Sequence, residues 1–318
     1  MKKLITAILA ITLTTLSMPA QANLKNRTSV PTLAVLDTAL DTSIPEIKSQ
    51  LIGEVCILDW PSCPNGTKFM EGAGAAVIPM NILVNRDFNH GTQMVSAAIA
   101  NNPNMNILFV RIIGHTSSGM RQSTNVHTVT NALEWVYNNR DKYNISAISV
   151  SQGNNIVINK KASTNYCPIT ATDIMVDRLI SVNIPVFFPS GNSGSIASMK
   201  NKIEWPACIP NAIAVGGVEV AGLDTPQASR TSNYDPVLVD TWDAMTSRVF
   251  FPGGQSGNAY GTSVANQIAA SKYVALKTVK PTFTVNQLIS LIKSTSKNIS
   301  NPLGQNILMF DLQKALSN

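Results

Sequence analysis

The sequence predicts an α/β fold with three layers, in which a mostly parallel, twisted sheet carries helices on both faces. Short, continuous apolar runs such as 32–37 and 106–114 are typical of strands that are buried on both faces. Segments with helical periodicity separate these runs along the chain. Strands that alternate with helices of this length form βαβ units, whose strands run parallel.

The elements follow in order along the chain. We expect strands at 32–37, 106–114, 145–151, 184–190 and 211–220, and helices at 90–100, 123–140, 171–183, 263–279 and 284–294. At the start of the second helix, Ser123 or Thr124 is a candidate N-cap. The stretch 53–88 has several Gly and Pro residues and little periodicity, which predicts an irregular surface insertion.

The first residues have the features of a secretion signal. Lys2 and Lys3 precede the apolar run 4–16, and Ala20-Gln21-Ala22 has the small-residue pattern of a cleavage site. An uncleaved anchor or a buried helix is the alternative. We therefore expect residues 1–22 to be a signal peptide, residues 23–318 to form one domain, and the protein to be secreted or periplasmic.

Composition excludes several classes of protein. Hydrophobic residues make up 44% of the chain and charged residues 13%, which is typical of a globular domain and not of a disordered chain. The formal net charge of +6 is not gathered into a basic stretch, so we expect no nucleic-acid partner. After residue 22 no apolar run is long enough to span a bilayer, so we expect no membrane contact after cleavage, and a monomer.

The four cysteines fit disulfide bonds in an oxidising compartment. Three pairings are open, and we favour Cys56–Cys63 as a local loop with Cys167–Cys208 as a long-range link. Free thiols or a zinc site are the alternatives. Zinc is disfavoured because no CxxC pair occurs and the three histidines lie elsewhere.

Three residues at the ends of predicted elements have the chemistry of a nucleophile, a base and an orienting carboxylate. Asp37 ends the first strand, His90 opens a helix of small residues, and Ser263 lies where a glycine turn enters a helix. Each also has an ordinary explanation, as a turn residue, a structural histidine and a helix N-cap. Their order along the chain, Asp, His and Ser, is the order found in subtilisin.

Four segments in this order resemble the subtilisin-like serine peptidases: AVLDTALD, NHGTQMVSAAIA, FFPSGNSGS and GTSVANQIAA. The resemblance spans about residues 31–279. It implies that Asp37 orients His90, that His90 is the general base, and that Ser263 is the nucleophile. It also implies that Asn192 donates its side-chain amide to the oxyanion, whereas turn chemistry alone would explain the Gly-Asn-Ser-Gly run.

The same resemblance implies how a protein or peptide substrate would bind. An extended substrate strand would pair with Ser149, Val150, Ser151, Gln152 and Gly153. The opposite wall of the main specificity pocket would be formed by Pro189, Ser190 and Gly191. Glu204 maps to the floor of that pocket, where a carboxylate favours Lys or Arg before the scissile bond; an exposed loop glutamate is the alternative.

The chain departs from the family pattern at several positions. Ala39 replaces a usual Gly, so the turn after Asp37 is expected to differ, and Gln93 and Asn89 also replace usual residues. At the pair Asn266-Gln267, in place of Ser-Pro, we expect altered packing. Only 14 residues, 23–36, separate Ala22 from Asp37, so no folded pro-domain would fit there.

These departures leave alternatives open. A subtilase-fold binding protein with weak or no catalysis is the second hypothesis. An unrelated esterase is disfavoured because it would need a GxSxG turn, which the sequence lacks. No cofactor or metal is predicted; structural calcium is common in the family, but no contiguous acidic loop identifies a site.

Overall fold

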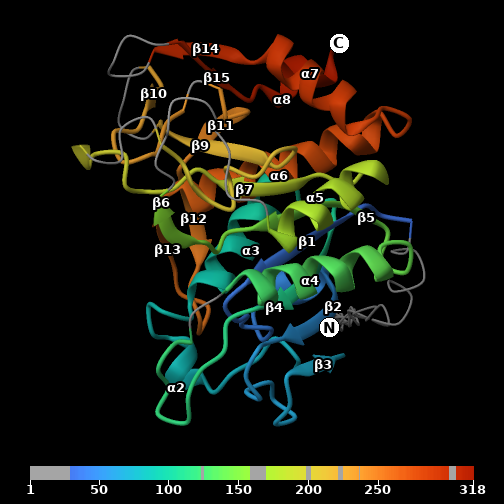
Figure 1. Ribbon diagram of the computed structural model, residues 1–318, viewed down its shortest axis with the longest axis vertical. Coiled ribbons are helices and arrows are strands. Elements are labelled where there is room, and N and C mark those ends of the chain that lie inside the picture. The colour runs from blue at the N-terminus through green and yellow to red at the C-terminus, as the bar shows by residue number, and fades with distance from the viewer. Residues whose placement is uncertain are drawn as a thin grey trace, which may run out of the picture.

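A computed structural model describes residues 29–122, 125–157, 170–197, 202–220, 225–235, 237–300 and 306–318. The chain forms three layers, with a central sheet between two layers of helices (Figure 1). In these ranges the sheet has 11 strands. The predicted signal peptide, residues 1–22, lies outside the described residues.

The central sheet is mostly parallel, as predicted. Its order is β14 (Lys297–Ser300), β15 (Asn306–Met309), β11 (Thr241–Ala244), β9 (Ile213–Glu219), β7 (Val186–Pro189), β5 (Ile145–Val150), β1 (Thr32–Asp37), β4 (Asn106–Arg111), β2 (Leu51–Ile57) and β3 (Phe69–Glu71). The pairs β2–β3 and β14–β15 are antiparallel, as is β9 with the short β10 (Gln227–Ala228). Two small sheets lie outside it: β12 (Thr246–Phe250) with β13 (Ser256–Tyr260), and β6 (Asn154–Val157) with β8 (Glu204–Trp205).

Each face of the sheet packs against its own pair of long helices. Alternate residues of β1, Leu33 and Val35, pack with α3 (His90–Asn101) and α6 (Thr262–Val279). The intervening residues, Ala34 and Leu36, pack with α4 (Val126–Asn139) and α5 (Ala171–Ser181). Because both faces are covered, every residue of β1 is buried, which explains why the strand reads as a continuous apolar run.

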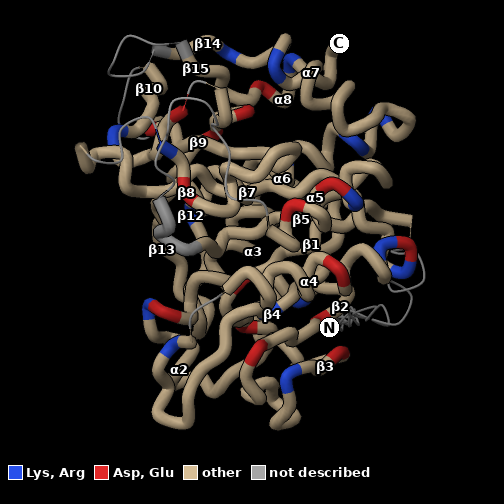
Figure 2. The backbone as a smooth tube through the Cα atoms, viewed as in Figure 1, with Lys and Arg blue, Asp and Glu red and all other residues tan. Residues whose placement is uncertain are grey.

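The remaining helices are α1 (Pro45–Gln50), α2 (Met80–Leu83), α7 (Val285–Thr295) and α8 (Leu312–Leu316). Helix α7 begins with a capping box, in which Thr284 and Gln287 satisfy each other's backbone N–H groups. Within the described residues, no helix is both long and apolar enough to cross a bilayer. Acidic and basic positions are interspersed along the tube in Figure 2, without a single basic face in that view.

Two details of the predicted elements are wrong. The N-cap of α4 is Asn125, whose side chain accepts from the Thr128 N–H at 3.0 Å, and the candidates Ser123 and Thr124 lie outside the described residues. Asn is among the residues most favoured at this position, because its side-chain oxygen can accept an N–H of the first turn. Four strands are shorter than expected by one to three residues at one or both ends. They are β4, β5, β7 and β9, expected at 106–114, 145–151, 184–190 and 211–220.

The predicted surface insertion, 53–88, is partly wrong. Its first residues belong to β2, which pairs with β4 inside the central sheet, and Leu83 and Phe88 are fully buried. Gly53 and Glu54 interrupt the apolar pattern of β2, which hides the strand from a periodicity argument. The segments between β2, β3 and α2 are irregular, as expected.

One of the two predicted disulfides lies in this region and is confirmed. Cys56, at the end of β2, is bonded to Cys63. Cys208 is also disulfide-bonded, but Cys167, its predicted partner, lies outside the described residues.

Candidate active site

A cavity of about 210 Å³ lies at the carboxyl ends of β5 and β7, beside the N-termini of α3 and α6. Ligand sites in parallel α/β sheets occur at this edge because the connecting loops of several strands meet there. The lining residues are Arg86, His90, Arg121, Ser151, Gln152, Gly153, Pro189, Gly191, Asn192, Glu204, Trp205, Pro206, Thr262 and Ser263. Two of the three predicted triad residues, His90 and Ser263, therefore line the same cavity.

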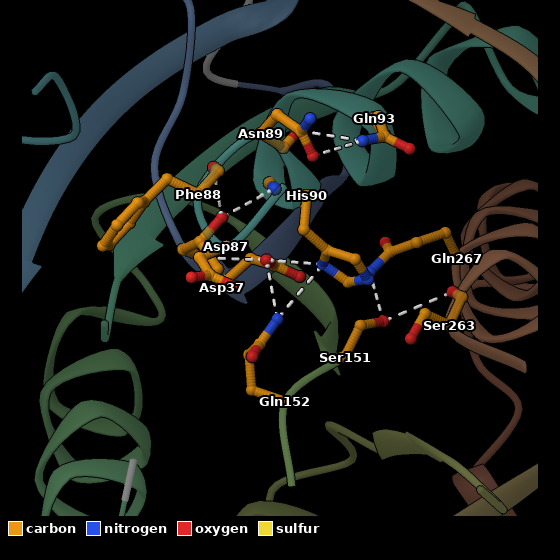
Figure 3. A network of polar contacts seen from close by, with 12 residues as sticks. Asp37, Asp87, Phe88, Asn89, His90, Gln93, Ser151, Gln152, Ser263 and Gln267 are labelled. Carbon is orange, nitrogen blue, oxygen red and sulfur yellow. Dashed lines mark hydrogen bonds and ion pairs between the residues drawn. The ribbon is translucent and has the colours of Figure 1, made fainter. Parts of the chain in front are cut away.

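The third, Asp37, lies beneath His90 and is fully buried. Its Oδ1 atom is 2.8 Å from Nδ1 of His90 (Figure 3). A carboxylate oxygen this close to Nδ1 requires a proton on Nδ1, because two lone pairs would repel each other. The second ring nitrogen, Nε2, is then unprotonated and able to accept a proton.

The position of His90 is fixed by hydrogen bonds between Thr38, directly after β1, and the residues around the start of α3. Thr38 donates its hydroxyl to the Phe88 carbonyl at 2.7 Å and accepts the Gly91 N–H at 2.9 Å. A Cβ atom on Gly91 would lie 2.4 Å from the Ala39 carbonyl oxygen, so only glycine allows this approach. Ala39 does not adopt a positive φ, so the replacement of the usual Gly causes no backbone strain here.

Ser263 is the second residue of α6, and it lines the cavity together with His90. Gly261 precedes the helix with φ 138° and ψ 168°, a conformation that is essentially restricted to glycine. Among the described residues, no hydrogen bond joins Nε2 of His90 to the Ser263 hydroxyl; hydrogen bonds of this kind are often long before substrate binds. The backbone N–H of Ser263 lies in the first turn, where such donors have no partner within the helix.

Asn192 follows β7 and is held by the same helix N-terminus. Its Oδ1 atom accepts the Thr262 N–H at 2.9 Å and the Thr262 hydroxyl at 3.1 Å. Because the oxygen end of the amide is fixed in this way, the Nδ2 donors are the end left to face the cavity. Thr262 was missed by the sequence argument, since its role depends on a contact across 70 residues of chain.

The residues predicted to pair with substrate are divided by the structure into two groups. Ser151, Gln152 and Gly153 line the cavity, whereas Ser149 and Val150 are fully buried in β5 and do not. A strand buried on both faces has no free edge toward the cavity, so only the segment beyond its end reaches the site.

The altered pair in α6 anchors this segment. Asn266 donates to the Ser149 hydroxyl at 2.9 Å, and Gln267 donates to the Ser151 hydroxyl at 3.0 Å. Ser151 in turn donates to the Ser263 carbonyl at 3.3 Å. The packing altered at Asn266-Gln267 is therefore a set of buried hydrogen bonds between α6 and the end of β5.

On the opposite wall, Pro189 and Gly191 line the cavity, whereas Ser190 is fully buried and donates to the Asn233 carbonyl. The Glu204 carboxylate lies against Gly191, where an added Cβ atom would be 2.5 Å from its Cδ. Burial raises the pKa of Glu204 above its ordinary value, and hydrogen bonds from the Ser193 hydroxyl and the Asn192 N–H partly offset this effect. The alternative of a freely exposed loop glutamate does not describe this half-buried side chain.

Two arginines of the cavity, Arg86 and Arg121, were also missed, because single basic residues in irregular segments carry no pattern. The side chain of Gln152 was missed as well, since the resemblance implied only a main-chain role for it. Gln152 Nε2 donates to Asp37 Oδ1 at 2.9 Å and lies 3.1 Å from His90 Nδ1 (Figure 3). Within the described ranges, no group of three or more His, Cys, Asp or Glu side chains could hold a metal ion.

Fold and site together define an α/β protein that carries a serine, a histidine and a buried carboxylate at the carboxyl edge of a parallel sheet. The chain belongs to the subtilase family, whose sequence profile matches residues 28–309. Subtilisin E of Bacillus subtilis strain 168 is 24% identical over 279 residues, which cover 85% of this chain and 61% of that protein. The chain thus spans less than two thirds of the length of this relative.

Other relatives are similar over more of their length. The subtilisin of Bacillus pumilus is 24% identical over 274 residues, covering 83% of this chain and 82% of that protein. Among solved structures, a cold-adapted subtilisin-like serine proteinase has a TM-score of 0.62 at 20% identity and covers 89% of each chain. A protease of Pseudoalteromonas arctica has a TM-score of 0.68 at 17% identity, covering 93% of this chain and 92% of that one. These likenesses confirm the predicted fold.

Proposed function

We propose that this protein is a secreted serine endopeptidase, which hydrolyses peptide bonds through an acyl-enzyme intermediate. Asp37, His90 and Ser263 would be its triad and Asn192 its oxyanion donor. The observation that carries the proposal is the 2.8 Å contact between Asp37 Oδ1 and His90 Nδ1, made by a histidine that shares one cavity with Ser263 and Asn192. Membership of the subtilase family supports the same reaction.

The proposed reaction proceeds in two halves. Nε2 of His90 takes the proton of the Ser263 hydroxyl while Oγ attacks the scissile carbonyl carbon, and the carbonyl π electrons move to its oxygen. The intermediate then collapses, the C–N bond breaks, and His90 returns the proton to the leaving amine. Water repeats the sequence on the acyl-enzyme, releasing the acid and restoring the serine hydroxyl. Asp37 stays ionised throughout and stabilises the imidazolium.

Negative charge on the carbonyl oxygen would be met by two donors. One is the Nδ2 group of Asn192, whose amide oxygen is occupied by Thr262. The other is the backbone N–H of Ser263 at the N-terminus of α6, where the helix dipole also favours negative charge.

The substrate would bind as an extended chain between two walls of the cavity, formed by 151–153 and by Pro189 and Gly191. Glu204, on the second wall, would pair with a Lys or Arg side chain before the scissile bond. Secretion rests on the predicted signal peptide and on the Cys56–Cys63 disulfide, which suits an oxidising compartment.

The second candidate function is a binding protein with weak or no catalysis. It is favoured by the observation that, in the described part of the chain, the Ser263 hydroxyl and His90 are not hydrogen-bonded. The two functions predict opposite results in a hydrolysis assay.

The test is hydrolysis of a peptide library by the purified full chain and its variants. Ser263→Ala is expected to lower kcat by about 10⁶-fold, and Asn192→Ala by about 10²- to 10³-fold. Ser49→Ala, on the exposed side of α1, is the matched control and keeps wild-type activity. Hydrolysis that persists in Ser263→Ala, or its absence from folded wild type, would contradict the proposal.

A further inference from the structure

The side chain of Gln152 contacts two members of the proposed triad, the buried Asp37 and the partly exposed His90. It is buried two residues beyond the end of β5, and its Nε2 lies 2.9 Å from Asp37 Oδ1 and 3.1 Å from His90 Nδ1. The same carboxylate oxygen accepts the Thr38 N–H at 2.7 Å and faces Nδ1 at 2.8 Å. Three nitrogen donors thus converge on one oxygen, and Figure 3 shows two of them, from His90 and Gln152.

Only one arrangement of protons fits these distances. The short contact between Nδ1 and Oδ1 requires the proton on Nδ1, so Nδ1 has no lone pair with which to accept from Gln152. The amide of Gln152 therefore donates to Asp37, and it lies beside the imidazole N–H without bonding to it. Because the two donors share one acceptor, the amide fixes where the carboxylate oxygen lies relative to the ring.

Arg121 determines which end of the Gln152 amide faces the carboxylate. Its Nη2 atom donates to Gln152 Oε1 at 2.5 Å, and a guanidinium group has only donors. Turning the amide over would place its NH₂ against the guanidinium and its oxygen against Asp37, two repulsive contacts. Arg121 therefore holds the amide in its donating orientation, and its positive charge polarises the Nε2–H bond further.

The pair connects the surface of the cavity with its buried carboxylate. Arg121 is exposed on the cavity wall, whereas Gln152 is buried beneath it. The Arg121 segment is held by a β-bridge to His115, and Nη1 donates to the Asp87 carbonyl at 3.4 Å. The guanidinium is thus held by a second contact besides the one to Gln152.

We propose that Gln152, oriented by Arg121, is a positioning residue that holds Asp37 and His90 in the geometry that the general base requires. This inference rests on the proposed function, because it assigns a role within that reaction. The contacts on which it rests are nevertheless present whether or not the protein is catalytically active, so it can be tested in both cases.

The kinetic test compares variants of the full chain on one peptide substrate. Gln152→Met, which keeps the length of the side chain and removes the donor, is expected to lower kcat by about 10- to 100-fold with KM within about twofold. Gln93→Met is the matched control, since Gln93 lies on α3 and its side chain, among the described residues, bonds to Asn89 and to no member of the proposed triad. A folded Gln152→Met that keeps its kcat within about twofold would overturn the proposal.

A double-variant cycle tests whether Arg121 acts through Gln152. Arg121→Met is expected to lower kcat, Arg121→Lys to restore part of the loss, and the double variant to lose no more than Gln152→Met alone. Fully additive losses would show that Arg121 acts separately and would overturn the coupling.

Proton NMR tests the contact without any activity. The Nδ1–H of His90, bonded to Asp37, is expected to give a low-field signal in wild type and in Ser263→Ala. The signal should move or disappear in Gln152→Met and stay in Gln93→Met. If wild type proves inactive, the proposed function fails, but the NMR signal still tests the role of Gln152. An unchanged signal in Gln152→Met would refute that role.

Discussion

At the scale of single residues, several side chains of the site form hydrogen bonds to the protein with one end, and these bonds orient the other end. Asn192 uses its oxygen on Thr262, which leaves its Nδ2 donors for a ligand. Asp37 directs Oδ1 at Nδ1 of His90, which leaves Nε2 of the ring as the nitrogen that is able to accept a proton. In each case a hydrogen bond on one side of the group determines what the other side can do.

Glu204 gives a prediction about the residue before the scissile bond. Glu204→Gln should lower kcat/KM for Lys and Arg substrates by about tenfold or more, because a charge-assisted contact is lost, and leave a Leu substrate unchanged. Paired peptides that differ only at this residue measure the effect. Glu46→Gln, at an exposed position of α1, is the control. Equal losses on both substrates would exclude Glu204 from specificity.

The pH dependence of this preference follows from the raised pKa of Glu204. Only the ionised carboxylate attracts a basic side chain, and a raised pKa moves ionisation to higher pH. The ratio of kcat/KM for Lys over Leu should therefore fall as pH drops through a range above 4.5, the ordinary pKa of this carboxyl. Taking the ratio removes any pH dependence that is common to both substrates. A ratio that is constant with pH would contradict the assignment.

At the scale of elements, the five central strands β1, β4, β5, β7 and β9 and the long helices could be predicted, because they are buried on both faces or on one regular face. β1 and α6 are found within one residue of the expected limits. β2 was missed because Glu54 interrupts it, and that carboxylate is accommodated by the Gly74 and Ala76 N–H groups at 3.0 and 3.2 Å. Such a contact joins residues about 20 positions apart, so periodicity within β2 does not reveal it.

The turn into α6 gives a prediction at this scale. Gly261→Ala should destabilise the protein by about 1–3 kcal/mol, because φ 138° is strained for any residue with a Cβ atom. It should also lower kcat, since relief of the strain would shift the first turn of α6, which carries Ser263 and holds Asn192 through Thr262. Denaturant unfolding and peptide hydrolysis measure the two effects.

The control for this variant is Gly254→Ala. Gly254 has φ 80° with nothing near its added Cβ, so its backbone strain is not accompanied by a contact with the site. We expect a loss of stability with unchanged kcat per folded molecule. A Gly261→Ala variant that behaves in the same way would show that the turn does not position Asn192.

At the scale of the whole molecule, the predicted sheet brings distant segments to one edge. Asp37 ends β1 and Asn192 follows β7, and these two strands run parallel on either side of β5, so both residues lie at the same edge of the sheet. This is why the order of motifs was sufficient to predict which residues meet. The inward direction of Gln152 could not be predicted, because it depends on Arg121, which lies 31 residues away.

The disulfide gives a prediction for the stability of the molecule. Replacing Cys56 and Cys63 together by Ala should lower the free energy of unfolding by about 2 kcal/mol, since the open chain gains entropy when a short loop is released. Denaturant unfolding under non-reducing conditions measures the change and leaves the disulfide of Cys208 intact. An unchanged midpoint would show that the loop is held by its other contacts.

The central claim is that Ser263 is a nucleophile activated by His90. It is tested most directly by labelling the folded full chain with a fluorophosphonate and mapping the modified residue by mass spectrometry. We predict a single adduct on Ser263, its absence from Ser263→Ala, and strongly slowed labelling in His90→Ala. Folded wild type that stays unlabelled, or an adduct on another serine, would contradict the claim.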